Sequence, residues 1–262
     1  MWKRPVGIIA GTVSAYVALA YFILPAIWRH HEHQPGLARL PMVTTAADGI
    51  PGDPLNIGLV GAREDVVRAM RLAGWSPADP ITLRSSMEIM GSVMFDRPYR
   101  TAPVSTLFYR GVREDLAFEL PAGHSAKQRH HVRIWKVMDA GVEGVPVWLG
   151  SATFDRGVAL SLYTGQLTHA IAPDIDAERD FLSEALTQTG VVDTIYKVSG
   201  VGPTLNGRNA EGTRYHTDGE IRMLVLVEGG DRRRGPARVL RDPSRVQVKD
   251  AAWQAIRRAL HS

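Results

Sequence analysis

The sequence contains no cysteine, and this absence removes several classes of chemistry at once. Disulfides, thiolate nucleophiles, and zinc or iron–sulfur centres held by cysteine are excluded. The chain also lacks a Gly-x-Ser-x-Gly nucleophile elbow, a His-Glu-x-x-His motif and a phosphate-binding loop with the Walker lysine. The usual signatures of serine hydrolases, zinc peptidases and nucleotide-binding proteins are therefore missing. We expect no bound metal and no cofactor.

The centre of the chain carries no net positive charge. The net charge is +4, to which residues 1–33 contribute +2 and residues 230–262 contribute +6, so the part between them carries −4. A nucleic-acid-binding domain normally presents a basic patch. We therefore expect no nucleic-acid partner.

The N-terminal segment is the longest stretch without charge, because residues 5–28 contain no Asp, Glu, Lys or Arg. A helix of about 24 residues spans roughly 36 Å, which is enough to cross a bilayer. Lys3 and Arg4 precede the segment, and only Arg29 follows closely, so the positive-inside rule places the N-terminus in the cytoplasm. We predict a single-pass anchor with the rest of the chain outside the cytoplasm. A cleaved signal peptide ending at Ala20 and a buried soluble helix are the alternatives.

Composition divides the chain into four parts. We expect an anchor and its flank at 1–34, a tether at 35–53, a folded domain at 54–229, and a basic tail at 230–262 with a short amphipathic helix. Hydrophobic periodicity in the domain predicts helices at 63–75, 82–95 and 176–190, and strands at 56–61, 104–112, 115–120, 194–198 and 220–228. Because several strands follow one another as hairpins, we predict an α+β fold with a largely antiparallel mixed sheet and about three helices.

A β-hairpin is predicted around a turn near Val142, where two alternating runs flank glycines. In register, Arg129 faces Asp155, and His131 faces Thr153. One face then carries the apolar side chains and His130, and we expect it to be the core. The other face, called the polar face, holds Arg129, His131, Arg133, Ser151, Thr153 and Asp155. It suits an anion such as phosphate, or it is a solvated surface with cross-strand ion pairs, and either alternative leaves His131 at the surface.

Residues 200–220 form a long polar stretch with five glycines between two apolar runs. Such a stretch inside a compact domain is usually either functional or disordered. We expect an ordered loop that faces the polar face. Its side chains Arg208, Asn209, Tyr215 and Asp218 would line a site or brace it.

An acidic segment, "TGQLTHAIAPDIDAERD", offers possible metal ligands such as His169 and Asp174. Its spacing matches no zinc signature. The acids of this segment have a simpler role, because carboxylates in a first helical turn interact favourably with the helix dipole. We therefore favour a helix start over a metal site here.

The segments "NIGLVGAREDVVRAMRLAGW", "APVSTLFYRGVREDLAFE", "RHHVRIWKV", "WLGSATFDRGVAL" and "GPTLNGRNAEGTRYHTDGE" stand in a characteristic order. Together they resemble the LssY-like C-terminal domain family of bacteria, over about residues 53–228. In larger members, this domain follows multi-spanning segments similar to lipid-phosphate phosphatases. The resemblance therefore implies a cell-envelope setting, here the bacterial inner membrane, and it transfers no catalytic residues.

Three functions remain open. The first is binding of an anionic ligand, such as a lipid phosphate, at the membrane surface through Arg129, Arg133, Arg208, Asn209 and Tyr215. The second is a phosphoester or lipid hydrolase that uses His131 or His169 as general acid or base, Asp155 and Asp218 as base or metal ligands, and Arg208 to stabilise the transition state. The third is a protein-interaction module of an envelope or secretion assembly.

Overall fold

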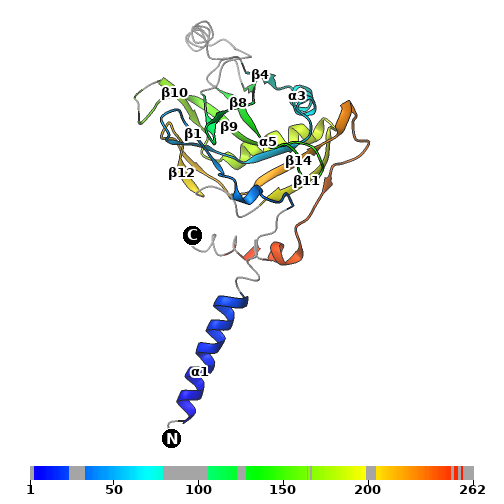
Figure 1. Cartoon of the computed structure of the whole chain (residues 1–262). Helices are drawn as coiled ribbons and strands as arrows, with labels where there is room; N and C mark the ends of the chain where they lie inside the picture. The colour runs from blue at the N-terminus through cyan, green and yellow to red at the C-terminus, as the bar shows by residue number, and fades with distance from the viewer. Residues whose placement is uncertain are drawn as a thin grey trace. The chain divides into compact units, whose positions relative to one another are not determined.

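The structure is a computed structural model that describes residues 3–23, 33–78, 106–122, 128–163, 165, 167–198, 205–248, 251–252 and 255. The chain divides into two units, one made of Met1–His31 and Arg241–Ser262 and the other of Glu32–Leu240 (Figure 1). The helix predicted at 82–95 lies outside the described residues.

The first unit contains α1, Lys3–Val17, which continues as the π-helical turn η1, Ala18–Ile23. No helix among the residues that the structure describes is long and apolar enough to cross a membrane. The predicted membrane-spanning helix is therefore not supported by α1 as described, and the end of the predicted span lies outside the described residues. Residues 244–248 are helical, whereas most of the tail helix predicted further on also lies outside them.

The second unit is built on a nine-stranded mixed sheet with the order β15-β11-β14-β3-β9-β8-β7-β4, in which β10 also pairs with β9. The bounds are β3 Ile57–Val60, β4 Ser76–Pro77, β7 Leu116–Pro121, β8 Arg129–Met138, β9 Val147–Leu160, β10 Leu167–Ile171, β11 Val192–Val198, β14 Ile221–Leu226 and β15 Arg238–Val239. Only the β14–β3 and β11–β15 pairs among these are parallel. The predicted α+β fold with a largely antiparallel mixed sheet is confirmed.

Two helices, α3 (Arg63–Leu72) and α5 (Ile175–Gln188), cover one face of this sheet (Figure 1). Asp174 caps α5, because its side chain accepts hydrogen bonds from the backbone N–H groups of Asp176 and Ala177. The helices pack on the even-numbered side chains of β8, such as Val132 and Ile134. The helices predicted at 63–75 and 176–190 are thus confirmed.

The opposite face of the sheet is covered by a smaller sheet with the order β2-β1-β5-β6 and by the chain that leads into it. Its bounds are β1 Val43–Thr45, β2 Pro51–Pro54, β5 Phe108–Tyr109 and β6 Val112–Arg113. Leu37 is fully buried in this layer. Residues 35–53 therefore belong to the folded unit and are not a tether, because their few apolar side chains complete a core that the main sheet leaves open.

The single strand predicted at 104–112 is also corrected. Within the described residues, the chain reverses between β5 and β6 at Arg110 and Gly111, both with positive φ, of 53° and 79°. This backbone suits the tight turn of a two-residue hairpin. The alternation of apolar residues continues across such a turn, so a periodicity argument does not detect it.

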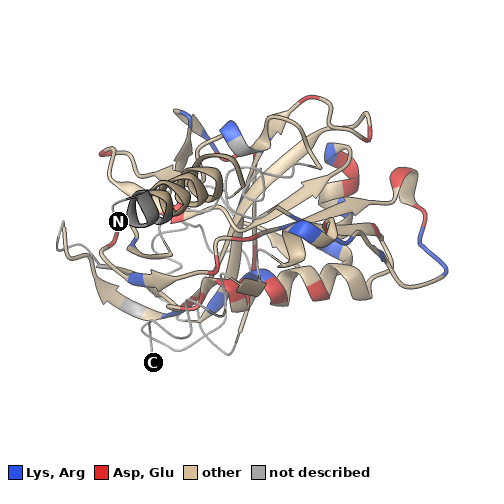
Figure 2. Cartoon of the chain, turned by 90° about the horizontal axis from the view of Figure 1, so that it is seen from below, with Lys and Arg blue, Asp and Glu red and all other residues tan. Residues whose placement is uncertain are grey.

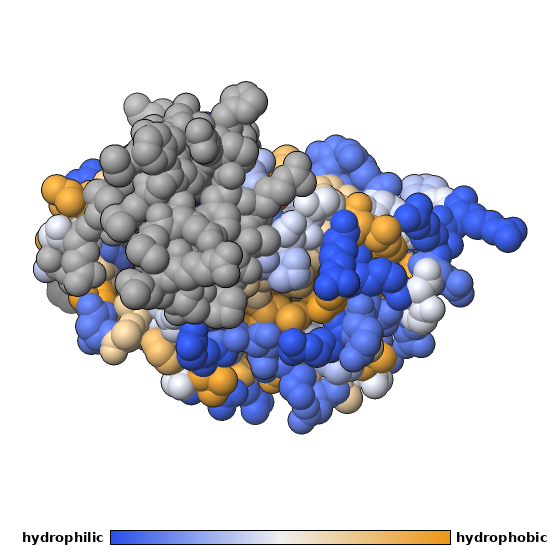
Figure 3. Space-filling view, turned by 90° about the horizontal axis from the view of Figure 1, so that it is seen from above, coloured by the Kyte–Doolittle hydropathy of each residue, from blue (hydrophilic) through white to orange (hydrophobic). Residues whose placement is uncertain are grey.

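Basic and acidic residues are both distributed along the described segments of the chain (Figure 2). The face in Figure 3 is mostly hydrophilic, with hydrophobic areas lying between hydrophilic ones. The apolar surface that a protein-interaction module would present is therefore not concentrated on the described part of this face.

Close packing between β3 and β14 gives the first test of the fold. A Cβ atom on Gly58 would overlap the Sδ atom of Met223, which lies opposite it in the register, and would lie 3.3 Å from the carbonyl oxygen of Trp148. We expect Gly58→Ala to lower the free energy of unfolding by about 1–3 kcal/mol through overpacking. Urea denaturation would measure the loss. Gly157→Ala on β9 is the matched control, because its Cβ meets no atom within 4 Å, and an equal loss in both variants would contradict the packing argument.

Candidate functional site

The hairpin register is confirmed residue by residue, but the polar face is not at the surface. Arg129 pairs with Asp155, His131 with Thr153, and Arg133 with Ser151. All six residues of the polar face are at most 4% exposed. The expectation that His131 lies at the surface was wrong, because the small sheet and a loop of distant residues cover this face. With Glu119 of β7, the six residues form a buried polar layer.

Arg129 forms ion pairs with two carboxylates of this layer. Its Nε atom donates to Asp155 Oδ2 and its Nη1 atom to Glu119 Oε2, both at 3.0 Å. The Glu119 carboxylate is fully buried. Burial of a charge is tolerated only where opposite charges and hydrogen bonds compensate for lost hydration. The guanidinium and the two carboxylates provide this compensation for one another.

His131 lies between Thr153 and Asp155. Its Nε2 atom is 2.7 Å from Thr153 Oγ1, and its Nδ1 atom is 3.3 Å from Asp155 Oδ2. Burial alone would raise the pKa of Asp155, but the charge and hydrogen bond of His131, with Arg129 and His169, hold that pKa well below its ordinary value. Asp155 is therefore an ionised carboxylate, and two of the predicted catalytic histidines, His131 and His169, lie near it.

A second branch of the layer connects it to the loop at 205–216. Arg133 Nη1 is 3.4 Å from Asp53 Oδ2, and Asp53 Oδ1 accepts a hydrogen bond of 2.9 Å from Asn209 Nδ2. Asn209 also accepts from the backbone N–H groups of Glu211 and Thr213 through its Oδ1 atom. The described part of the loop is thus ordered and reaches the polar face through Asn209, as predicted, and Asn209 braces the structure rather than lining a cleft.

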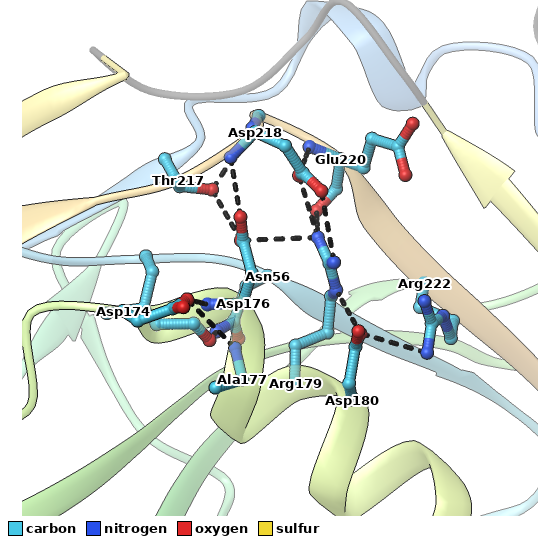
Figure 4. A network of polar contacts seen from close by, with 12 residues as sticks. Asn56, Asp174, Asp176, Ala177, Arg179, Asp180, Thr217, Asp218, Glu220 and Arg222 are labelled. Carbon is cyan, nitrogen blue, oxygen red and sulfur yellow. Dashed lines mark hydrogen bonds and ion pairs between the residues drawn. The ribbon is translucent and has the colours of Figure 1, made fainter.

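Asp218 belongs to a different network, at the start of α5 (Figure 4). The guanidinium of Arg179 donates to both oxygens of Asp218, at 2.8 and 3.1 Å, and to the Glu220 carbonyl oxygen at 3.0 Å. Asp176 accepts from Thr217 Oγ1 at 2.7 Å and from the Asp218 backbone N–H at 2.6 Å. This network fixes the turn at 217–220 onto α5. It does not bring Asp218 to the catalytic candidates His131, His169 and Asp155.

The part of the loop that remains accessible is a short hairpin of β12, Asn206–Arg208, and β13, Arg214–His216. Its buried side holds Tyr215, which packs against Ile171 and Ile175. The Tyr215 ring lies over Gly207, where a Cβ would come within 2.6 Å of the phenolic oxygen. Tyr215 therefore anchors the hairpin, and only glycine fits beneath its ring.

The outer side of this hairpin borders an open cleft of about 640 Å³. The cleft, called the arginine cleft, is lined by Pro173, Asn206, Gly207, Arg208, Arg214, Tyr215 and His216. Arg208 and Arg214 stand directly opposite each other in the register, and like charges in that position destabilise a strand pair. Among the residues that the structure describes, Arg208 donates to the Gly212 carbonyl oxygen alone, at 2.6 Å, and Arg214 has no hydrogen bond or ion pair. The cleft therefore presents two guanidinium groups that form no ion pair with the described part of the chain.

His216, which lines the cleft, lies beside a carboxylate, because its Nε2 atom is 3.8 Å from Asp174 Oδ2. Both side chains are about half exposed. Among the described residues, no group of three or more histidine or acidic side chains is arranged to hold a metal ion. The geometry of the cleft is that of an anion site, because convergent arginine donors match phosphate and carboxylate oxygens.

Fold and site together define an α+β domain with a buried ionic layer and an arginine-lined surface cleft. A model of the family described as LssY C-terminus matches residues 37–221, and the chain belongs to this family. Comparisons with curated proteins and with solved structures found no match.

Proposed function

We propose that the protein is a membrane-anchored envelope domain that binds the phosphate or a similar anionic group of a ligand in the arginine cleft. The opposed pair Arg208 and Arg214 is the single observation that carries the proposal. An anion between the two guanidinium groups would turn their repulsion into two charge-assisted contacts. The exposed imidazole of His216 would supply a third donor when protonated.

This proposal moves the anion site away from Arg129 and Arg133. Both guanidinium groups are buried, and both are paired with carboxylates of the chain itself. A ligand phosphate would have to displace these carboxylates and enter a closed layer. The arginines of the cleft need neither step.

Membrane anchoring is supported by the sequence of the N-terminal segment. Residues 5–28 carry no charge, and the basic residues Lys3 and Arg4 precede them. A tethered domain would meet phosphate-bearing head groups at a high effective concentration. This arrangement fits an N-terminus in the cytoplasm of a bacterium and a domain on the other side of the inner membrane.

A hydrolase that uses His131, His169 and Asp155 is less well supported. His131 is 3% exposed, and it already contacts Thr153 and Asp155. A general acid or base must reach the proton that it transfers. Arg208, which would stabilise the transition state, borders the surface cleft instead.

The binding test uses the full chain in nanodiscs of neutral lipid and isothermal titration with inorganic phosphate and glycerol 3-phosphate. We expect the double variant Arg208→Ala/Arg214→Ala to weaken binding at least about tenfold, because a hydrogen bond to a charged group contributes roughly 1.5–3 kcal/mol. Arg71→Ala on the exposed side of α3 is the control and should leave the dissociation constant unchanged. Absence of binding by the unaltered chain, or equal weakening by the control, would refute the proposal.

A further inference from the structure

We propose that the tip of the β9–β10 hairpin inserts into the interfacial region of an anionic phospholipid bilayer while Arg208 and Arg214 bind lipid phosphates. This inference rests on the proposed function and deepens it, because it names a phospholipid head group as the source of the anion. The tip is defined by Leu160, Leu162 and Tyr163.

The tip combines side chains that water solvates poorly. Leu160 is 64% exposed, Leu162 is 70% exposed and Tyr163 is 52% exposed. The two leucines and the tyrosine lie within four consecutive residues, 160–163, so their exposed apolar side chains are close together in the chain. Leucine side chains gain free energy in the acyl region, and tyrosine rings favour the boundary with the head groups.

The tip is physically joined to the arginine cleft. The Leu162 backbone N–H donates to the Glu211 carbonyl oxygen at 3.2 Å. A Cβ on Gly212 would lie 2.7 Å from Leu162 Cβ, so the two turns are in van der Waals contact. The Gly212 carbonyl oxygen is the acceptor that holds Arg208 Nη1. The exposed leucine and the arginine are therefore attached to the same turn.

Charge complementarity indicates that a phospholipid bilayer binds to the tip and the arginine cleft. An apolar tip beside two arginines that pair with no described carboxylate matches a bilayer, in which acyl chains lie directly beneath a layer of phosphates. A lipid in the cleft would place its phosphate between Arg208 and Arg214 and its acyl chains toward Leu162. Each basic residue near an anionic leaflet raises the membrane affinity roughly fivefold, so the pair gives roughly a 25-fold preference over a neutral bilayer.

The absence of cysteine makes a site-specific test simple. Leu162→Cys carries a nitroxide label in the full chain, which is incorporated into nanodiscs of neutral phosphatidylcholine or of phosphatidylcholine with phosphatidylglycerol. Relative accessibility to oxygen and to a water-soluble nickel complex measures the depth of the label. We expect the label to be shielded from the nickel complex in anionic nanodiscs. Shielding should be lost in the Arg208→Ala/Arg214→Ala background and weaker in neutral nanodiscs.

Val142→Cys is the matched control, because Val142 is 59% exposed in the turn that precedes β9. A 14-residue strand spans roughly 46 Å, so the accessibility of this label should not depend on lipid charge or on Arg208 and Arg214. Tyr163→Cys provides a second label at the tip, and a urea-unfolding midpoint equal to that of the unaltered chain establishes that each labelled variant is folded.

A tip label that stays in water in anionic nanodiscs overturns the inference, as does equal shielding in neutral and anionic nanodiscs. Shielding that appears without any lipid and depends on protein concentration also overturns it and identifies a second copy of the chain as the occupant. The proposed function fails separately, because it requires phosphate binding in the titration. Phosphate binding with a tip in water would leave a soluble phosphate compound as the ligand.

Discussion

We expect the Asp155→Asn variant to lose about 3–5 kcal/mol of the free energy of unfolding, the amount typical when one partner of a buried ion pair is removed. Asparagine has the same shape as aspartate, so no cavity arises. It has no charge, however, so Arg129 loses one of its two described carboxylate partners, and His131 loses the carboxylate next to its Nδ1 atom. Because both neighbours are buried, water cannot replace the lost charge.

Urea denaturation followed by tryptophan fluorescence would measure this loss, since Trp135 and Trp148 are buried in the two cores. Asp139→Asn is the matched control. Asp139 is also paired with a basic residue, at 2.7 Å from Lys136 Nζ, but its side chain is 90% exposed. An unchanged midpoint is expected there. If both substitutions had the same effect, burial would not be the cause.

The same carboxylate gives the protein a defined acid limit. The pKa of Asp155 is lower in the folded state than in the unfolded state, where it is about 3.9. Above that unfolded value, the ionised carboxylate contributes its full stability; as the pH falls, the unfolded state binds the proton first and the contribution decreases. Stability should therefore decline below about pH 5, and the Asp155→Asn variant should decline less steeply. Parallel stability curves for the two proteins between pH 5 and pH 3 would contradict the assignment.

The hairpin illustrates how far the sequence determines the structure. Its register follows from alternation and from the turn, both of which are local, and the pairing of Arg129 with Asp155 confirms it. Its burial depends on residues that are remote in the sequence. Asp53 and Asn209, which cover the polar face, are 156 residues apart. Alternation separates two faces of a sheet, but it does not distinguish water from a second layer of protein that supplies opposite charges.

The composition of the polar face did contain a feature that indicates burial. It has both arginine and aspartate with small hydroxyl side chains between them, and it has no lysine, whereas solvated strands are rich in long flexible charges. The cleft residues Arg214 and His216 were missed for another reason. Their importance depends on the pairing of β12 with β13, and a stretch with five glycines gives no periodicity from which that pairing can be predicted.

The second large effect is expected from Arg179→Met, which should lower the free energy of unfolding by about 2–4 kcal/mol. Methionine fills a similar volume but removes the guanidinium that donates to Asp218 and to the Glu220 carbonyl oxygen. The Asp218 side chain is 32% exposed, so water compensates in part, and the loss is smaller than for a fully buried pair. Burial favours a raised pKa at Asp218, but the Arg179 hydrogen bonds lower it below its ordinary value, so that pKa should rise in the variant.

The effect of Arg179→Met should be concentrated in the turn at 217–220 (Figure 4). The Asp218 backbone N–H donates to Asp176, and the Glu220 backbone N–H donates to Asp218, so both depend on carboxylates that Arg179 holds in place. Hydrogen exchange at these two amides should accelerate more than exchange in β11. Arg222→Met is the control, because Arg222 pairs with the half-exposed Asp180 and with no other described carboxylate, and such pairs contribute at most about 1 kcal/mol. Equal losses in the two variants would mean that the turn is held by the backbone alone, and Asp218 would then be available to act as a functional side chain rather than a brace.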